Sequence, residues 1–217
     1  NWFIETPYLL EHYPAPAVRF YLALNNPEQK ELNFTWQDFV QTNNSVLVGT
    51  VGNFVHRVLS LSKKNFGRTI RLQGISGAVR FRIEQTFQNT SAHLERGEIR
   101  AAAGEVVRLA SFGNQYVDRN KLWNLVKENP KEAKKIVQDC LALSGAFSLL
   151  LYPFVPQSAQ KLRSLLGIAA IAPKEEKDQW QYAGLPSKIS LAKTIIPLFS
   201  KIDEKHIALE VAKLNRT

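Results

Sequence analysis

The sequence predicts an all-α fold, a helical bundle built by a chain long enough for one large domain. Apolar side chains recur at steps of three and four along several segments, which is the spacing of one helix face. Capping residues precede several of these segments, and strand-type alternation is weak everywhere outside Ala78–Ile83, so the sequence is interpreted as helical. With 45% hydrophobic residues among 217, the chain can bury a core of its own.

The first two expected helices lie in the N-terminal third. A helical run from Ala15 to Leu24 ends at the sequence Asn25-Asn26-Pro27. A second helix is expected from Trp36 to about Lys64, with one apolar stripe formed by Leu47, Val51, Phe54, Val58 and Leu61. A turn of 100° per residue places Asn53, His56, Arg57, Ser60 and Lys64 on the opposite side. Asn53 and Arg57 are one turn apart and should project side by side.

The middle of the chain combines glycine with clustered positive charge. Seven basic residues and no acidic residue lie between Arg57 and Arg82. Such clustering creates a phosphate-binding surface, although an ordinary solvated face is the alternative. A long helix is then expected from about Ser91 to Arg119.

Helix boundaries are clearest in the C-terminal half. Asn129 is expected to cap a helix that has Pro130 at its first position and that runs to Pro153. Another helix begins at Pro156 and is ended by Gly167. An irregular part around Trp180 precedes a last helix, from about Asp203, which acts as its cap, to Leu214.

Composition and motifs limit the classes of function that the chain could have. A net charge of +9 favours a polyanionic partner. The sequence has no phosphate-binding loop, no nucleophile elbow and no zinc-protease motif, so no catalytic residue is assigned. The four histidines are scattered, so no metal site is expected, and Cys140 falls on an apolar helix stripe and should be core. No stretch is long and apolar enough to span a membrane, and we expect a cytoplasmic protein.

Four stretches of the chain, in order, resemble the C-terminal part of the methionyl-tRNA synthetases, a class I aminoacyl-tRNA synthetase family. These are Leu9–Leu22 (LLEHYPAPAVRFYL), Asn43–Leu59 (NNSVLVGTVGNFVHRVL), Phe112–Trp123 (FGNQYVDRNKLW) and Pro197–Ile207 (PLFSKIDEKHI). The sequence Tyr-Pro-Phe-Val-Pro at 152–156 adds lesser agreement. The resemblance extends over nearly the whole chain.

The resemblance implies three segments. Residues 1–32 would end the stem-contact region, residues 33–167 would form the anticodon-binding helical bundle, and residues 168–217 would form a tail whose final helix packs back on the enzyme. The family's catalytic domain, which uses ATP with Mg²⁺, would lie upstream. Because the chain starts at Asn1 and contains no methionine, we expect it to be a piece of a longer protein.

The resemblance also implies which residues read the RNA. Residues that contact the CAU anticodon of tRNA(Met) in the family correspond here to Asn53, Arg57 and Trp123. Asn114, Gln115 and Tyr116 are expected to shape the helix end that presents Trp123. One departure is Leu122, which stands where the family commonly has proline.

The basic stretch after Arg57 does not follow the family closely. Its residues are assigned only as candidate phosphate contacts, namely Lys63, Lys64, Arg68 and Arg71.

Two functions remain open at this point. The first is anticodon recognition within a methionine–tRNA ligase, which attaches methionine to tRNA(Met) with ATP. The second is a stand-alone helical module that binds RNA or protein and does not discriminate between anticodons. For the site itself, the structural alternative is that Asn53 and Arg57 are simply solvated and that Trp123 fills the core.

Overall fold

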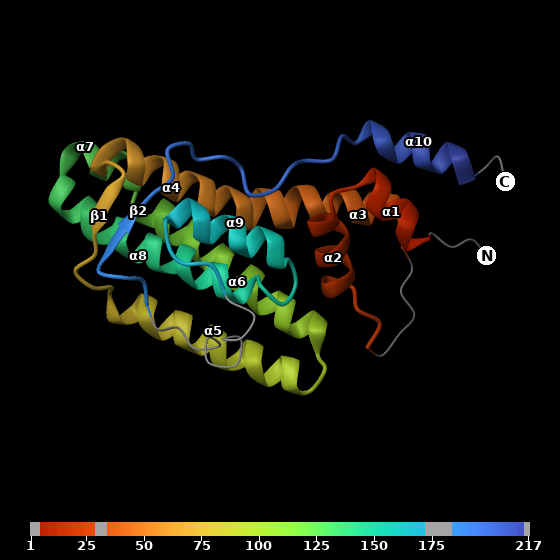
Figure 1. Cartoon of the computed structure of the whole chain (residues 1–217), viewed down its shortest axis with the longest axis horizontal. Helices are drawn as coiled ribbons and strands as arrows, with labels where there is room; N and C mark the ends of the chain where they lie inside the picture. Colours follow the sequence, from red (N-terminus) through yellow and green to blue (C-terminus); the bar gives the residue numbers. More distant parts are fainter. Residues whose placement is uncertain (1–4, 29–33, 172–183, 215–217) are drawn as a thin grey trace.

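The described parts of the chain, residues 5–28, 34–171 and 184–214 of this computed structural model, form long helices that lie side by side (Figure 1). This confirms the predicted all-α class. The elements in chain order are α1 (Thr6–His12), α2 (Ala15–Leu24), α3 (Trp36–Gln41), η1 (Thr42–Gly52), α4 (Asn53–Phe66), β1 (Thr69–Arg71), α5 (Gly77–Glu95), α6 (Ile99–Arg119), α7 (Leu122–Glu128), α8 (Pro130–Leu150), α9 (Pro156–Leu166), β2 (Lys188–Ser190) and α10 (Lys205–Leu214).

The helix expected from Trp36 to about Lys64 is present, but its middle is wider than an α-helix. Segments α3, η1 and α4 follow one another without a gap, and η1 is π-helical. The Oγ1 of Thr50 donates to the carbonyl of Ser45, five residues earlier, at 3.0 Å. Phe54 and Val58 are buried as the apolar stripe predicts. The sequence carries no signal for the added residue in each turn of η1.

The stretch Ala78–Ile83, where strand-type alternation is least weak, lies in the α-helix α5, in agreement with the helical interpretation. Val79 and Ile83 are four positions apart and both fully buried, so the same residues also satisfy helical spacing. Ser76 caps the helix, and its hydroxyl accepts from the amide of Val79 at 3.4 Å.

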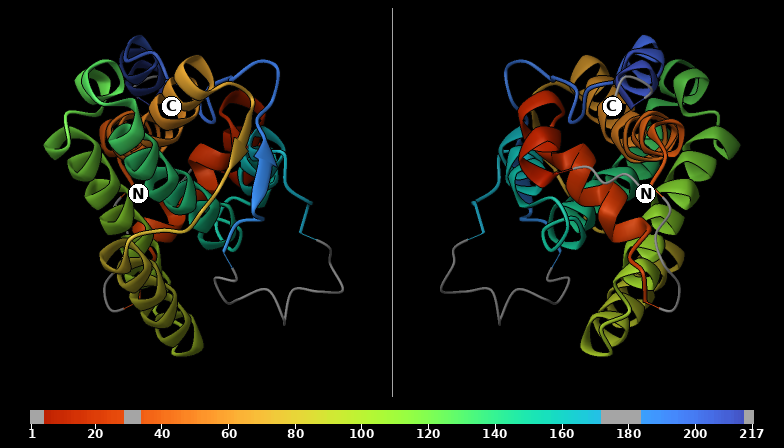
Figure 2. Two further views of the ribbon diagram at one scale, coloured as in Figure 1. Left: turned by 90° about the vertical axis from the view of Figure 1, so that its left-hand side faces the viewer. Right: turned by 90° about the vertical axis from the view of Figure 1, so that its right-hand side faces the viewer.

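The helix expected from about Ser91 to Arg119 ends where predicted, but its start was wrong, because two helices meet within that range. Helix α5 ends at Glu95, and α6 begins at Ile99. Gly97 between them has φ of 74°, a left-handed conformation that glycine adopts without steric cost. The result is a hairpin of two long helices, in which α6 packs within the bundle and α5 protrudes beside it (Figure 2).

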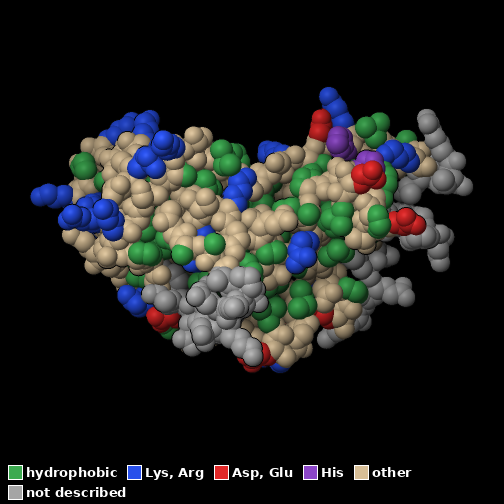
Figure 3. Space-filling model, viewed as in Figure 1, with side chains coloured by type: hydrophobic (Ala, Val, Ile, Leu, Met, Phe, Trp, Pro, Cys, Tyr) green, Lys and Arg blue, Asp and Glu red, His purple; other side chains and the backbone are tan. Residues whose placement is uncertain are grey.

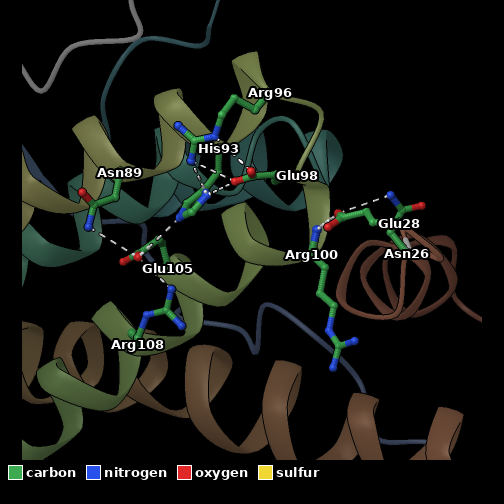
Figure 4. Close-up of polar contacts among 9 residues, drawn as sticks. All are labelled: Asn26, Glu28, Asn89, His93, Arg96, Glu98, Arg100, Glu105 and Arg108. Carbon is green, nitrogen blue, oxygen red and sulfur yellow. Dashed lines mark hydrogen bonds and ion pairs between the residues drawn. The ribbon is translucent and has the colours of Figure 1, made fainter. Parts of the chain in front are cut away.

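Polar side chains hold this hairpin together at its turn (Figure 4). Arg96 donates to Glu98 through Nη2 at 2.8 Å and Nε at 3.0 Å, and the Nδ1 of His93 lies 2.6 Å from the same carboxylate. Deeper in the hairpin, Glu105 accepts from Arg108 at 2.7 Å and from Asn89 at 3.4 Å.

Replacing Glu98 by glutamine is expected to lower the thermal midpoint by a few degrees at most at pH 7. Hydrogen bonds from Arg96 and then from His93 lower the pKa of Glu98 from its ordinary 4.5 to about 2. Because the folded pKa lies below the unfolded one, the carboxylate stabilises the fold above pH 4.5, and this stabilisation is lost as the pH falls toward 2. Thermal melts from pH 7 to pH 2 should therefore converge for the two proteins. A gap that stays constant down to pH 2 would contradict this.

Two clusters of buried apolar side chains form the core. The larger one lies between η1, α4, α6, α8 and α9, and the smaller one lies between α1, α2 and α3. In the smaller cluster the ring of Tyr13 packs against Trp36 and Phe39, with centroids 5.3 Å away in each case. Because this cluster joins both sides of the boundary expected between 1–32 and 33–167, those two segments share a core. The division into three functional segments stays a prediction.

Helix boundaries in the C-terminal half follow the predictions. The side chain of Asn129 accepts from the amide of Glu132 at 3.2 Å at the start of α8, and α9 ends at Gly167 in a left-handed conformation. Cys140 on α8 is fully buried, and burial raises the pKa of its thiol well above the usual range. It is a core residue, as expected.

The last described segment, residues 184–214, returns along the bundle from one end to the other (Figure 1). Strand β2 pairs antiparallel with β1, and the chain then runs beside α4 to α10 at the opposite end. Phe199 packs against Gly52, where an added Cβ would lie 3.1 Å from its ring. Asp203 caps α10 as predicted, since its Oδ1 accepts from the amide of Lys205 at 3.0 Å. The part around Trp180 that we expected to be irregular lies outside the described residues.

None of the helices in residues 5–28, 34–171 and 184–214 combines the length and the apolar character that crossing a membrane requires. Within the same ranges, no three side chains of His, Cys, Asp or Glu come together as they would around a metal ion.

Candidate nucleic-acid interface

Arg57 and Trp123, which the sequence places 66 positions apart, lie in contact. Arg57 is on α4 and Trp123 is on α7, and the Cζ of the guanidinium is 5.1 Å from the centre of the indole ring. A cation over the face of an indole is attracted by the negative charge of that face. The indole is 41% exposed, so Trp123 presents a flat surface to solvent and is not a core residue.

Asp118 at the end of α6 forms an ion pair with the guanidinium of Arg57. Its Oδ1 lies 3.2 Å from the Nη2 of Arg57, and the two side chains are 55% and 36% exposed. Arginine carries five N–H donors in a fixed plane, so an ion pair through one nitrogen leaves donors free to meet a ligand. The guanidinium is therefore oriented by an acid and an aromatic ring while staying open to solvent.

Asn53 extends this exposed site along α4. It is the first residue of the helix and is exposed, and it lies one α-helical turn before Arg57. Because η1 ends at Gly52, the regular α-helical geometry that aligns the two side chains begins at Asn53 itself.

Close packing of α6 on α4 brings Asp118 within reach of Arg57. A Cβ on Gly113 of α6 would lie only 2.7 Å from the ring of Phe54, so a larger residue would push the helices apart. Asn114 fixes the alignment further, because its Nδ2 donates to the carbonyl of Thr50 at 3.0 Å. Asp118 and Gly113 lie in the quoted stretch Phe112–Trp123 but were assigned no role from the sequence, because both act through contacts between helices.

The turn between α6 and α7 decides which way Trp123 points. Lys121 has φ of 43°, and it is the one residue other than glycine in the described chain with a positive φ. This left-handed residue reverses the chain so that Leu122 is buried and Trp123 faces out. A buried Leu122 thus anchors the start of α7 by packing.

Tyr116, one of the three residues expected to shape this helix end, links it to α8. The hydroxyl of Tyr116 donates to the Oδ2 of Asp139 on α8 at 2.6 Å, and the other oxygen of Asp139 accepts from the amide of Ser76 at 2.7 Å. Burial and this hydrogen bond raise the pKa of Tyr116 well above its usual range. Gln115 is exposed.

The four candidate phosphate contacts divide into two pairs. Lys63 and Arg68 both donate to backbone carbonyls of the returning C-terminal segment: Lys63 to that of Lys193, and Arg68 to that of Leu191 at 3.0 Å. Lys64 and Arg71 are exposed. Lys63 and Arg68 therefore help to hold the C-terminal segment in place, whereas Lys64 and Arg71 face solvent.

Solved structures with a similar fold are known. The free form of the Mycobacterium tuberculosis methionyl-tRNA synthetase superimposes with a TM-score of 0.80 at 19% identity, covering 93% of this chain and 41% of that one. The same enzyme in complex with methionyl-adenylate gives a TM-score of 0.78 over 90% of this chain. At this level of identity the likeness concerns the fold.

Comparison with protein sequences is more specific. A family model described as the anticodon binding domain of methionyl tRNA ligase matches residues 76–213, and a model of class I tRNA synthetases (M) matches residues 1–59. Similar proteins include methionine–tRNA ligases of Bacillus cereus (strain B4264), 31% identical, and of Roseiflexus sp. (strain RS-1), 36% identical. Each alignment covers 99% of this chain but only 38% and 40% of those relatives, so the chain spans about two fifths of their length.

The helical bundle and the two matched family models define the chain as part of a class I aminoacyl-tRNA synthetase. The two matched models overlie both halves of the site, since the first covers Trp123 and the second covers Asn53 and Arg57. Within that class, the chain belongs to the methionyl-tRNA ligase family, and it contains that family's anticodon-binding domain.

Proposed function

We propose that this chain reads the CAU anticodon of tRNA(Met) as part of a methionine–tRNA ligase. The observation that carries the proposal is the contact between Arg57 and Trp123. The Cζ of the guanidinium lies 5.1 Å from the centre of the exposed indole ring, and Asn53 is one helical turn away. An unpaired base offers two flat faces and a hydrogen-bonding edge, and this site presents a partner for each.

The roles of the three residues follow from their chemistry. Cytosine presents an amino donor beside two acceptors on its pairing edge. Asn53 can donate and accept, whereas Arg57 can only donate, so together they can match that edge. Stacking on Trp123 adds about 1–3 kcal/mol per base but accepts any base. Selectivity for the anticodon therefore comes mainly from Asn53 and Arg57.

The rest of the proposed activity belongs to the whole protein. Its relatives are methionine–tRNA ligases, and a solved synthetase with the same fold was captured with methionyl-adenylate, an activated amino acid. We therefore infer a catalytic domain in the same protein that activates methionine with ATP and Mg²⁺, then transfers it to tRNA(Met). The described residues carry the RNA-reading part.

The test is a titration of the chain with a stem-loop RNA bearing CAU and with three variants, each changed at one anticodon base. We expect the CAU loop to bind at least tenfold more tightly than each variant at moderate salt. Lys201→Ala removes one exposed charge near α10, at the opposite end of the bundle, and should leave this ratio unchanged. Equal affinity for all four loops would instead identify a helical RNA-binding module without anticodon discrimination.

A further inference from the structure

Strands β1 and β2 form an exposed two-stranded ribbon with like charges facing each other across it. In the antiparallel register Arg71 is the direct partner of Lys188, and Ile70 is the partner of Ile189. The two isoleucines are buried beneath the ribbon, whereas Arg71 and Lys188 are exposed on its outer face. Like charges directly opposite each other destabilise a strand pair.

The surroundings of this pair are also positive. No acidic residue occurs in residues 57–82, and none occurs in residues 184–202, which contain three lysines. The fold lays these two segments against each other, because Leu191 donates its amide to the carbonyl of Arg68 at 2.9 Å. Lysine and arginine side chains accordingly gather at the end of the molecule where β1, β2 and α7 lie (Figure 3). Exposed Lys64 and Lys193 add to this charge.

This basic ribbon adjoins the site that holds Asn53 and Arg57. Lys64 follows Arg57 by seven residues, which is two helical turns or about 10 Å along the same side of α4. Seen from the end of the bundle, α4 lies between α7 on one side and the ribbon on the other (Figure 2). A nucleic acid whose bases lie on α4 and α7 would therefore have its backbone within reach of the ribbon.

We propose that the β1–β2 ribbon binds RNA phosphates beyond the anticodon bases, with a phosphate between Arg71 and Lys188. The proposal rests on the proposed function in that both require a bound RNA. A phosphate oxygen accepts hydrogen bonds from both side chains, so its negative charge relieves their mutual repulsion. In the free protein, the repulsion between Arg71 and Lys188 lowers the stability of the ribbon. A bound polyanion removes this repulsion.

Two of the nearby basic residues have a different role and are excluded from the contact. Lys63 and Arg68 hold the carbonyls of Lys193 and Leu191, and so they keep β2 and the residues after it in position. Substituting them would disturb the ribbon itself. Arg71 and Lys188 can be changed on its outer face without removing these supports.

The decisive variant is Lys188→Glu, because it should move stability and RNA binding in opposite directions. An acid opposite Arg71 replaces repulsion with attraction, so the thermal midpoint of the free chain should rise. The same acid repels phosphate, so the affinity for every stem-loop should fall. Unfolding cannot account for weaker binding by a more stable protein.

A second variant measures the number of phosphate contacts. In Arg71→Gln/Lys188→Gln, the slope of log affinity against log salt should become shallower by about 1 to 2. A slope shallower by 1 means that the variant's loss of affinity relative to the parent is about tenfold larger at 0.1 M than at 1 M salt. Lys201→Gln is the matched control, since Lys201 is exposed in the same acid-free segment but lies near α10. It should change neither slope nor affinity.

The two proposals fail in different ways. If the ribbon variants keep the parent's affinity and salt slope, the ribbon does not bind RNA and this inference is overturned, whatever the anticodon preference. The chain could instead bind all anticodon loops equally while the double variant still has a shallower slope of log affinity against log salt. That result would support the ribbon contact and contradict anticodon recognition. The preference for CAU over other loops should be unchanged in all ribbon variants.

Discussion

Arg57→Ala is expected to weaken binding of a CAU stem-loop by about ten- to a hundredfold. Hydrogen bonds from a charged donor contribute about 1.5–3 kcal/mol, and each 1.4 kcal/mol is tenfold in affinity. The loss should be much smaller for loops in which the base read by Arg57 is changed, because those complexes lack the hydrogen bonds. Titrations of the cognate and variant loops by fluorescence anisotropy at one salt concentration would measure both effects.

Two controls separate base reading from charge and from folding. Arg57→Lys keeps the positive charge but loses the planar set of donors and the stacking on Trp123, so it should behave like the alanine variant. Lys64→Ala should weaken all loops uniformly. The free energy of unfolding should fall by less than about 1 kcal/mol in Arg57→Ala, because the ion pair with Asp118 is exposed. A uniform loss across loops for Arg57→Ala would show that it acts only as a charge.

Gly167→Ala is expected to lower the free energy of unfolding by about 2–5 kcal/mol. Gly167 ends α9 with φ of 67°, and a side chain in that left-handed region costs about 1–2 kcal/mol. Its Cβ would also overlap the carbonyl oxygen of Ser190 in β2, at 2.1 Å, so the strand would have to move. Forcing extra atoms into a packed site costs about 1–3 kcal/mol more. Urea denaturation would measure the change.

Gly97→Ala is the matched control for this prediction. Gly97 has φ of 74°, but no atom lies within 4 Å of the position that its Cβ would take. It should therefore lose only the conformational part, about 1–2 kcal/mol. Equal losses for the two variants would mean that the contact between α9 and β2 does not resist displacement.

Local signals in the sequence were sufficient where one residue defines a boundary. Asn129 and Pro130 predicted the start of α8, and Gly167 predicted the end of α9, because capping and left-handed termination depend on the backbone of a few neighbours. The α5–α6 hairpin was missed although Gly97 at its turn adopts the same left-handed conformation as Gly167. Val79 and Ile83 fit a strand or a helix equally well, and packing in the core selects the helix.

The same distinction between local signals and distant contacts applies to the candidate site. Helical geometry alone placed Asn53 and Arg57 side by side, since both belong to one element. The contact of Arg57 with Trp123 and Asp118 depends on three helices meeting, and the left-handed Lys121 that turns Trp123 outward has no marker in the sequence. The ribbon could not be predicted either, because a strand of three residues carries too little pattern.

The partnership between Arg68 and Leu191 joins positions 123 residues apart, and this separation has a consequence for synthesis. Proteins are made from the N-terminus at about 5–20 residues per second, and contacts between distant residues form only after both have been made. A growing chain therefore completes α4 and α7, with Arg57 and Trp123, before residues 188–193 leave the ribosome. The helices that carry Arg57 and Trp123 are made first, and the positively charged ribbon beside them is among the last parts of the molecule to assemble.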